Sequence, residues 1–154
     1  PGRLEGVTPG AAAPALPAMT PVEETLADLW ATGVSRVHPV AHVREALDEL
    51  GALSAARLAG TPGETNVVVA GLVTHRQRPP TAGGIVFMTL EDETGIINVV
   101  CPPAVFQRYR GLAVDAQALL VGGRLERADG VANVRATRLR RLPVPGRVKA
   151  RNFH

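Results

Sequence analysis

Phe87 and Asn98 carry side-chain types that recognise an unpaired base: a ring that can stack on it and an amide that can read its edge. Each lies in a run of residues typical of a β-strand. If every second residue from Val86 to Leu90 fills an interior, Phe87 faces outward; the alternative exchanges the two faces and buries the ring. Asn98 is the only polar side chain between Gly95 and Cys101, so we expect it outside, either reading a base beside Phe87 or solvated.

Cationic side chains flank these two residues. At the end of the preceding strand-like run, we expect Arg76 and Arg78 to contact phosphate while His75 and Gln77 point to the other face. Four later arginines are placed to complete a basic rim around the ring. The predicted nucleic-acid-binding residues are therefore His75, Arg76, Gln77, Arg78, Phe87, Asn98, Arg124, Arg127, Arg135 and Arg138.

Residues that could catalyse a reaction or hold a metal do not converge. Cys101 lies at a strand end without an obvious base, and Ser54 lacks the GxSxG context of a nucleophile. His38 and His42 have the spacing of metal ligands, but His38 precedes a proline and need not be helical. The acidic run from Glu91 to Glu93 is expected to face water in a turn. We predict no catalytic residue, no metal and no cofactor.

The formal net charge of +3 is unevenly distributed over the 154 residues. Residues 1–65 carry four basic and eight acidic side chains, whereas residues 66–154 carry thirteen basic and six acidic ones. From Gly130 to the end there are seven cations and no carboxylate, an arrangement that attracts polyanions. The alternative is a solvated basic face followed by a frayed tail.

The elements that would position these side chains follow the order β-β-β-α-β-β. Glycine-rich and acidic turns separate the extended runs, and Pro102 and Pro103 precede the single helical run. This order is that of a five-stranded OB-fold barrel, with the helix closing one end, so the predicted fold class is mainly β. The expected strands are 66–78, 84–91, 96–101, 117–127 and 131–139, and the expected helix is 104–112.

A small helical hairpin is predicted before the barrel. A T-x-x-E capping box at Thr20 starts a first helix that ends near Gly33, and a second helix runs over 39–50. Trp30 is interpreted as the packing anchor of this hairpin, with base stacking as the alternative. The predicted domains are a flexible lead-in over 1–19, the hairpin over 20–60, the OB domain over 64–142 and a basic tail over 143–154.

The cellular setting is expected to be the cytoplasm. One cysteine offers no disulfide framework, no apolar run reaches the length of a membrane span, and the first residues do not read as an export signal. Because the chain begins at Pro1 with a linker-like segment, we expect a fragment of a longer protein.

Several stretches resemble the C-terminal part of bacterial error-prone DNA polymerases of the ImuC type, C-family relatives of the DNA polymerase III alpha subunit. The resemblance covers residues 18–154 and is carried by the runs 69–79, 81–84 and 90–101, by 22–33 ahead of the barrel and by 147–153. It implies translesion synthesis and damage-induced mutagenesis, with ImuA- or ImuB-type proteins and the sliding clamp as partners. It also implies that the catalytic palm lies in another part of the parent chain.

A more distant resemblance joins residues 84–98 to the anticodon-binding OB domain of aspartyl-type tRNA synthetases. There the aromatic residue matching Phe87 stacks on a base and the polar residue matching Asn98 reads one. That family has a basic residue where this chain has Gln77, which argues against tRNA-like readout.

Two functions of different classes follow. The first is a module that binds single-stranded template DNA through stacking and phosphate contacts, without strong sequence preference and without membrane association. The second is a protein-interaction module that docks an ImuA- or ImuB-type partner. A stand-alone enzyme is poorly supported, because no acid, base, nucleophile and metal set converges.

Overall fold

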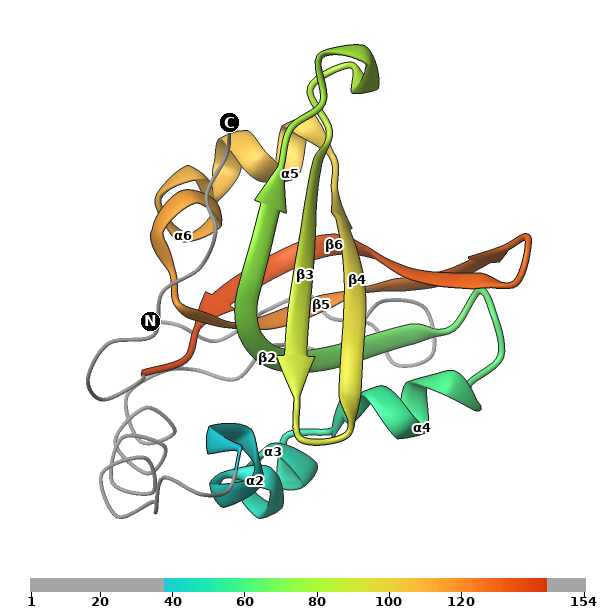
Figure 1. The fold of residues 1–154 in the computed structure, drawn as a ribbon, viewed down its shortest axis with the longest axis vertical. Helices are drawn as coiled ribbons and strands as arrows, with labels where there is room; N and C mark the ends of the chain where they lie inside the picture. Colours follow the sequence, from blue (N-terminus) through green and yellow to red (C-terminus); the bar gives the residue numbers. More distant parts are fainter. Residues whose placement is uncertain (1–37, 144–154) are drawn as a thin grey trace, which may run out of the picture.

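The computed structural model describes residues 38–143, which form a closed β-barrel with helices on one side and at one end (Figure 1). Neighbouring strands follow the order β1-β2-β3-β4-β6-β5, and the pairing of β2 with β5 closes the barrel. The fold is mainly β, as predicted. The strands are β1 (Ala52–Leu53), β2 (Asn66–Gln77), β3 (Val86–Asp92), β4 (Gly95–Cys101), β5 (Ala118–Ala128) and β6 (Val131–Arg141).

Strand β2 belongs to both halves of the barrel. Its first part pairs with β5 and its second part with β3, and the two pairings overlap at Leu72. The strand bends near this point, and its backbone lies close to that of β3. A Cβ on Gly71 would lie 2.8 Å from the carbonyl oxygen of Glu91. A glycine is therefore required where β2 crosses from one half to the other.

The barrel interior is filled by the alternate residues that the strand pattern predicts. Side chains from all five long strands and from the closing helices form one buried cluster, in which Phe106 is the bulkiest member. Phe106 comes from α5 (Pro103–Arg108), which is followed by α6 (Arg110–Asp115) where the sequence predicted one helix over 104–112. The chain breaks at Tyr109, and the second helix continues three residues beyond the predicted end.

The helices before the barrel cover the outer face of β2 and β5. The predicted helix 39–50 is divided into α2 (Pro39–His42) and α3 (Arg44–Glu49), and a further short helix, α4 (Ala55–Ala59), follows β1. Apolar side chains of α2, α3 and the residue between them pack on outward-facing strand residues in a second cluster, whereas Leu58 of α4 belongs to the barrel cluster. The second cluster comprises Val40, Val43, Leu47, Ala52, Val68, Ala70, Leu72, Ala118, Leu120 and Leu142. The predicted first helix with Trp30, the lead-in 1–19 and the tail beyond residue 143 lie outside the described residues.

An ion-pair network attaches these helices to the turn between β3 and β4. The Arg44 guanidinium donates to Glu93 Oε2 at 2.7 Å and to Asp92 Oδ2 at 3.2 Å. Asp92 is buried and also accepts from the backbone amides of Ala55, Thr94 and Gly95. The expectation that this acidic run faces water is therefore wrong for Asp92, because its carboxylate organises the turn and joins it to α4.

The β5–β6 hairpin has the turn that its sequence indicates. Asp129 and Gly130 both have positive φ angles, +54° and +78°, and Ala128 pairs directly with Val131. Two residues with positive φ make the type I′ connection that matches the twist of paired strands. The Asp-Gly pair was the local signal for it.

Candidate nucleic-acid interface

Phe87 lies on the outer face of β3. Its side chain is 38% exposed, whereas Val86, Met88 and Leu90 are buried in the barrel. The outward orientation of Phe87 is thus confirmed, and the alternative with exchanged faces is wrong. Asn98 on β4 is exposed on the same side, as predicted.

The strand register aligns Phe87 with polar neighbours in two rows that run across the sheet. In the first row Gln77 pairs with Phe87, Phe87 with Val100, Val100 with Arg135, and Arg135 with Arg124. The second row lies two residues away along each strand. It contains His75, Thr89, Asn98, Asn133 and Glu126. The two rows place a ring, amides and a cation within reach of one extended ligand.

A β-bulge at Thr74 decides which residues of β2 join these rows. The register between β2 and β3 shifts between Val73 and His75, so the residues after the bulge change faces. His75 and Gln77 are therefore exposed on the outer face, opposite Thr89 and Phe87. The prediction that His75 and Gln77 point away from the binding face is wrong, because it assumed uninterrupted alternation.

Arg76 is turned inward by the same bulge and is only 3% exposed. Its Nε donates to the carbonyl oxygen of Ala113 at 2.6 Å, and a terminal nitrogen donates to that of Ala116. Burial lowers the pKa of Arg76, while Asp115 opposes that shift. Arg76 satisfies carbonyl groups at the end of α6, so the prediction that it contacts phosphate is wrong.

Arg124 and Arg127 already have partners within the chain. The Arg124 guanidinium donates to Glu64 Oε1 at 2.7–2.8 Å while remaining exposed. Arg127 donates to the carbonyl oxygens of Leu58, Ala59 and Thr61, at 2.7–3.1 Å, and thereby caps the C-terminal end of α4. Arg127 therefore holds the helix against the hairpin.

The remaining three predicted arginines lie in different surroundings. Arg135 is exposed within the first row and makes no ion pair with a described residue. Arg138 lies beyond a second bulge, opposite Gly122 and outside the stretch of β6 that pairs with β4. Arg78 is exposed at the end of β2, with its guanidinium carbon 5.0 Å from the centroid of the Phe106 ring. Of the six predicted arginines, Arg135 alone is aligned with Phe87 and has no ion pair within the described part of the chain.

Asn133 is a residue of this face that the sequence analysis missed. It lies on β6, and the parallel pairing of β4 with β6 sets it opposite Asn98. A parallel pair has no connecting turn that reveals its register. The spacing of the two asparagines along the chain therefore offered no signal.

Two of the residues considered for catalysis or metal binding are a buried thiol and a helix-capping histidine. Burial raises the pKa of the Cys101 thiol to about 11, so it is a weak nucleophile at neutral pH. His38 caps α2 by accepting a hydrogen bond from the Val40 amide at 3.1 Å. Within residues 38–143 no group of three or more His, Cys, Asp and Glu side chains could hold a metal ion.

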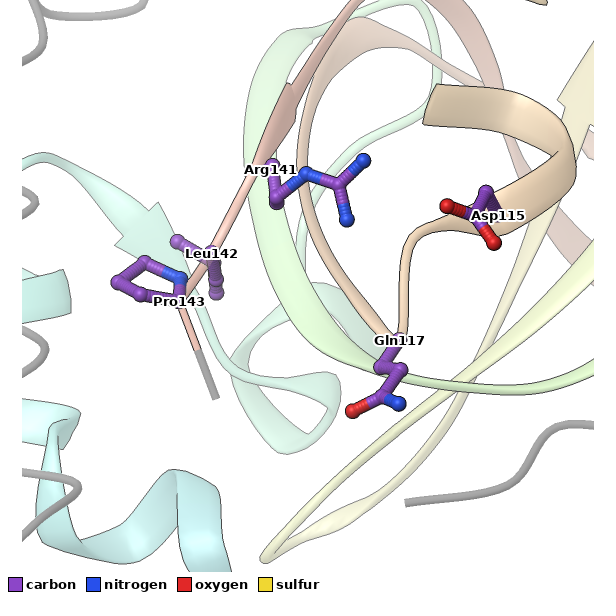
Figure 2. A pocket seen from close by; sticks show the side chains of 5 residues that line it. All are labelled: Asp115, Gln117, Arg141, Leu142 and Pro143. Carbon is purple, nitrogen blue, oxygen red and sulfur yellow. The ribbon is translucent and has the colours of Figure 1, made fainter. Parts of the chain in front are cut away.

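A pocket of about 330 Å³ lies away from the two rows, where the α6–β5 junction meets the end of β6. Figure 2 shows the Arg141 guanidinium and the Asp115 carboxylate facing the same space, whereas the amide of Gln117 points away from them. A single cation facing a carboxylate is a poor site for a polyanion. No helix of the described segment is long and apolar enough to cross a membrane.

Comparison with known proteins gives the same assignment for the barrel. Residues 67–142 match the family of the OB-fold nucleic acid binding domain. Among solved structures, asparaginyl-tRNA synthetase from Pyrococcus horikoshii complexed with asparaginyl-adenylate aligns with a TM-score of 0.51 and 21% identity. That alignment covers 60% of this chain and 22% of the synthetase. At this identity the likeness concerns the fold alone.

The sequence relatives are error-prone DNA polymerases. That of Mycolicibacterium paratuberculosis is 47% identical over 154 residues, which are 99% of this chain and 14% of the polymerase. That of Nocardia farcinica is 47% identical over 151 residues, 97% of this chain and 13% of the polymerase. Residues 67–142 thus form an OB-fold domain that matches the OB-fold nucleic acid binding domain, within a chain homologous over nearly its whole length to about one seventh of an error-prone DNA polymerase.

Proposed function

We propose that the outer face of β3, β4 and β6 binds single-stranded template DNA as part of an error-prone DNA polymerase. The observation that carries this proposal is the first row, in which the exposed ring of Phe87 lies between the amide of Gln77 and the free guanidinium of Arg135. A base stacks on the ring, the amides of Asn98 and Asn133 contact its edge, and Arg135 contacts phosphate.

Weak sequence preference follows from this arrangement. Stacking accepts any base, because every base has a π-face. The amide contacts come from Gln77, Asn98 and Asn133 at the strand surface, where each can rotate to donate or accept a hydrogen bond. The face therefore suits a template strand of any sequence better than one anticodon.

The parent protein would use this module during translesion synthesis and damage-induced mutagenesis. The relatives are about seven times longer than the aligned segment, so we assign nucleotide incorporation to the rest of such a chain. We also propose that the sliding clamp and ImuA- or ImuB-type proteins act through that parent chain in the cytoplasm. The isolated 154-residue chain should show no primer extension with Mg²⁺ and all four deoxynucleotides.

Binding can be tested by fluorescence anisotropy with a labelled oligothymidylate of about 16 nucleotides, the upper site size of one OB fold. We expect saturable binding at about 50 mM salt that weakens at about 200 mM, because phosphate contacts release counterions. A labelled duplex of the same length is the control and should bind more weakly. Undetectable binding of the single strand at low salt would show that the proposal is wrong.

A second candidate function, docking of an ImuA- or ImuB-type partner, is favoured by two exposed apolar side chains on the same face. Ile96 is 63% exposed and Val131 is 48% exposed. Each lies two residues before the paired asparagines Asn98 and Asn133, just outside the stretch in which β4 pairs with β6. Apolar side chains of this kind form the centre of protein interfaces.

One double variant distinguishes the two candidate functions, DNA binding and partner docking. Ile96→Ser combined with Val131→Ser, which removes the apolar contacts without adding charge, should abolish capture of a purified ImuB-type protein if the face docks protein. The same double variant should leave single-strand affinity within about twofold if Phe87 and Arg135 bind DNA. Loss of single-strand binding without any loss of partner capture would contradict this division of the surface.

A further inference from the structure

A cluster of arginines and aromatic rings lies at the barrel end closed by α5 and α6, outside the two rows. Arg78 from the end of β2 and Arg110 from α6 both place their guanidinium carbons over the Phe106 ring, 5.0 and 5.3 Å from its centroid. Arg108 lies over Tyr109 at 5.6 Å. These five residues are called the end patch. They come from the end of β2 and from the consecutive helices α5 and α6, which meet at one end of the barrel (Figure 1).

The end patch is an uncompensated concentration of positive charge. Arg78, Arg108 and Arg110 are all exposed, and none of them forms an ion pair with a carboxylate of the described residues. By contrast, Arg44 and Arg124 are paired with carboxylates. Two guanidinium groups at one ring add their positive potentials, which favours binding of an anion beside them.

The barrel becomes less acidic from the β3–β4 turn toward the end patch. The stretches 65–90 and 94–114 contain no carboxylate side chain. Both stretches include residues at the barrel end that α5 and α6 close. The opposite end carries Glu91, Asp92 and Glu93 around the β3–β4 turn. A phosphodiester chain crossing the outer face is therefore drawn away from the turn and toward α5.

The end patch continues from the first row. Arg78 directly follows Gln77, and Val100 is separated from the start of α5 at Pro103 by only two residues. Each guanidinium lies over an aromatic ring, and the N–H groups in its plane remain available for a bidentate phosphate contact. The rings thus hold the arginines in place, while the buried Phe106 itself is not accessible for base stacking.

We infer that the end patch is a second contact site for the same single-stranded nucleic acid, binding the phosphates of nucleotides that extend past Phe87 over α5 and α6. This inference rests on the proposed function of the strand face. It assigns phosphate binding to Arg78, Arg108 and Arg110. The outer face supplies the base contacts, and the end patch lengthens the bound segment and sets its path.

The test compares two oligothymidylates, of about 4 and about 16 nucleotides, which are the limits of the OB site size. Arg108→Gln combined with Arg110→Gln should weaken binding of the long strand by about five- to tenfold per lost contact at about 50 mM salt. The slope of log affinity against log salt should become shallower by about 0.7 for each contact. Binding of the short strand, centred on Phe87, should be nearly unchanged.

Arg57→Gln is the matched control for each single substitution, because Arg57 is an exposed arginine on α4, away from the end patch and without an ion pair to any of residues 38–143. It removes one positive charge and should change affinity by less than twofold. Unchanged thermal unfolding of each variant, followed by circular dichroism, shows that folding is intact. A charge reversal, Arg110→Glu, should weaken long-strand binding further than Arg110→Gln.

Failure of the end patch and failure of the proposed function give different results. If the unaltered chain binds neither strand at low salt, both proposals are wrong. If it binds both and Phe87→Ala weakens both, but the Arg108 and Arg110 variants behave like Arg57→Gln on the long strand, only the end patch is wrong. Equal weakening of the short and long strands by those variants would also contradict a separate, length-dependent site.

Discussion

Phe87 is the residue on which the single-strand proposal depends most directly. It combines an exposed ring with neighbours that can hydrogen-bond, and its position follows from the burial of Val86, Met88 and Leu90 on the other face of β3. Ile96 offers a comparison on the same surface, since it is more exposed but lies at the acidic end, opposite Glu91. Position and ring chemistry therefore distinguish the two residues, whereas apolar exposure alone does not.

Phe87→Ala is expected to weaken binding of a single strand by about 1–3 kcal/mol, which corresponds to roughly five- to 150-fold in the dissociation constant. Fluorescence anisotropy measures it. Ile96→Ala is the matched control and should change affinity by less than twofold. Equal effects of the two substitutions would show that binding depends on general apolar contact and not on stacking.

Arg76 is a residue whose charge supports stability. Its guanidinium donates to carbonyl oxygens of Ala113 and Ala116 inside the barrel end. Arg76→Met should lower the free energy of unfolding by about 2–4 kcal/mol, because these buried acceptors lose charge-assisted hydrogen bonds.

Urea denaturation measures this loss. Arg135→Met removes the same charge from an exposed position and should change stability by no more than about 0.5 kcal/mol. If Arg135→Met destabilised the chain as much as Arg76→Met, the interior hydrogen bonds would not be the cause.

At the scale of elements, the β3–β4 turn and α3 stabilise each other through Arg44. Hydrogen bonding and the charge of Arg44, with a contribution from His38, hold the pKa of Glu93 below its ordinary value of 4.5. A carboxylate whose pKa is lower in the folded chain stabilises it fully above the unfolded pKa and loses that contribution as pH falls through the folded value. The network should therefore be intact at neutral pH and weaken in acid.

Glu93→Gln is expected to lower the free energy of unfolding at pH 7 by about 1–2 kcal/mol. The difference from the unaltered chain should shrink progressively below pH 4.5, where the unaltered carboxylate also becomes protonated. Urea denaturation at pH 7 and at a pH of about 3 checks this. A difference that stayed constant or grew in acid would contradict the direction of the pKa shift.

The β5–β6 pairing depends on a glycine at a close approach. A Cβ at Gly123 would lie 2.3 Å from the carbonyl oxygen of Arg135, beside the register shift opposite Gly122. Gly123→Ala should therefore destabilise the chain by about 2 kcal/mol or more, because backbone has to move.

Gly111 in α6 is the control, since a Cβ there meets no atom within 4 Å. Gly111→Ala should be neutral or stabilising by up to about 1 kcal/mol, as expected for alanine in a helix. Thermal unfolding compares the two variants. A stable Gly123→Ala chain would show that the strands can separate at this point without cost.

At the scale of the whole molecule, residues 38–60 and the barrel form one packing unit. The helices contribute Val40, Val43 and Leu47 to a cluster completed by outward-facing residues of β2 and β5. An OB barrel without this cover would expose the apolar side chains of Val68, Leu72 and Leu120 to water. We therefore propose that the helical segment and the barrel unfold together.

Leu47→Ala tests this coupling, since Leu47 is fully buried between the helices and the barrel. It should lower the free energy of unfolding by about 2–5 kcal/mol in one cooperative transition. Amide hydrogen exchange in β5 should accelerate together with exchange in α3. Faster exchange in α3 alone would show that the helices open independently of the barrel.

The sequence by itself determined the type and order of the strands and the Asp129-Gly130 turn, and it favoured the outer face for Phe87 without excluding the other. These features depend on contacts within a strand or turn, where apolar alternation and the φ angles of a few residues decide the outcome. It also indicated the division into barrel and preceding helices, although β1, α4 and the break at Tyr109 were not predicted.

Only the tertiary structure decided which charged and polar side chains share the candidate surface. One bulge turned Arg76 inward, to carbonyls 37 and 40 residues away, and brought His75 and Gln77 outward. A parallel pairing set Asn133 beside Asn98. The physical reason is that a guanidinium binds whichever acceptors or anions the closed barrel brings near it, and distance along the chain does not specify that partner.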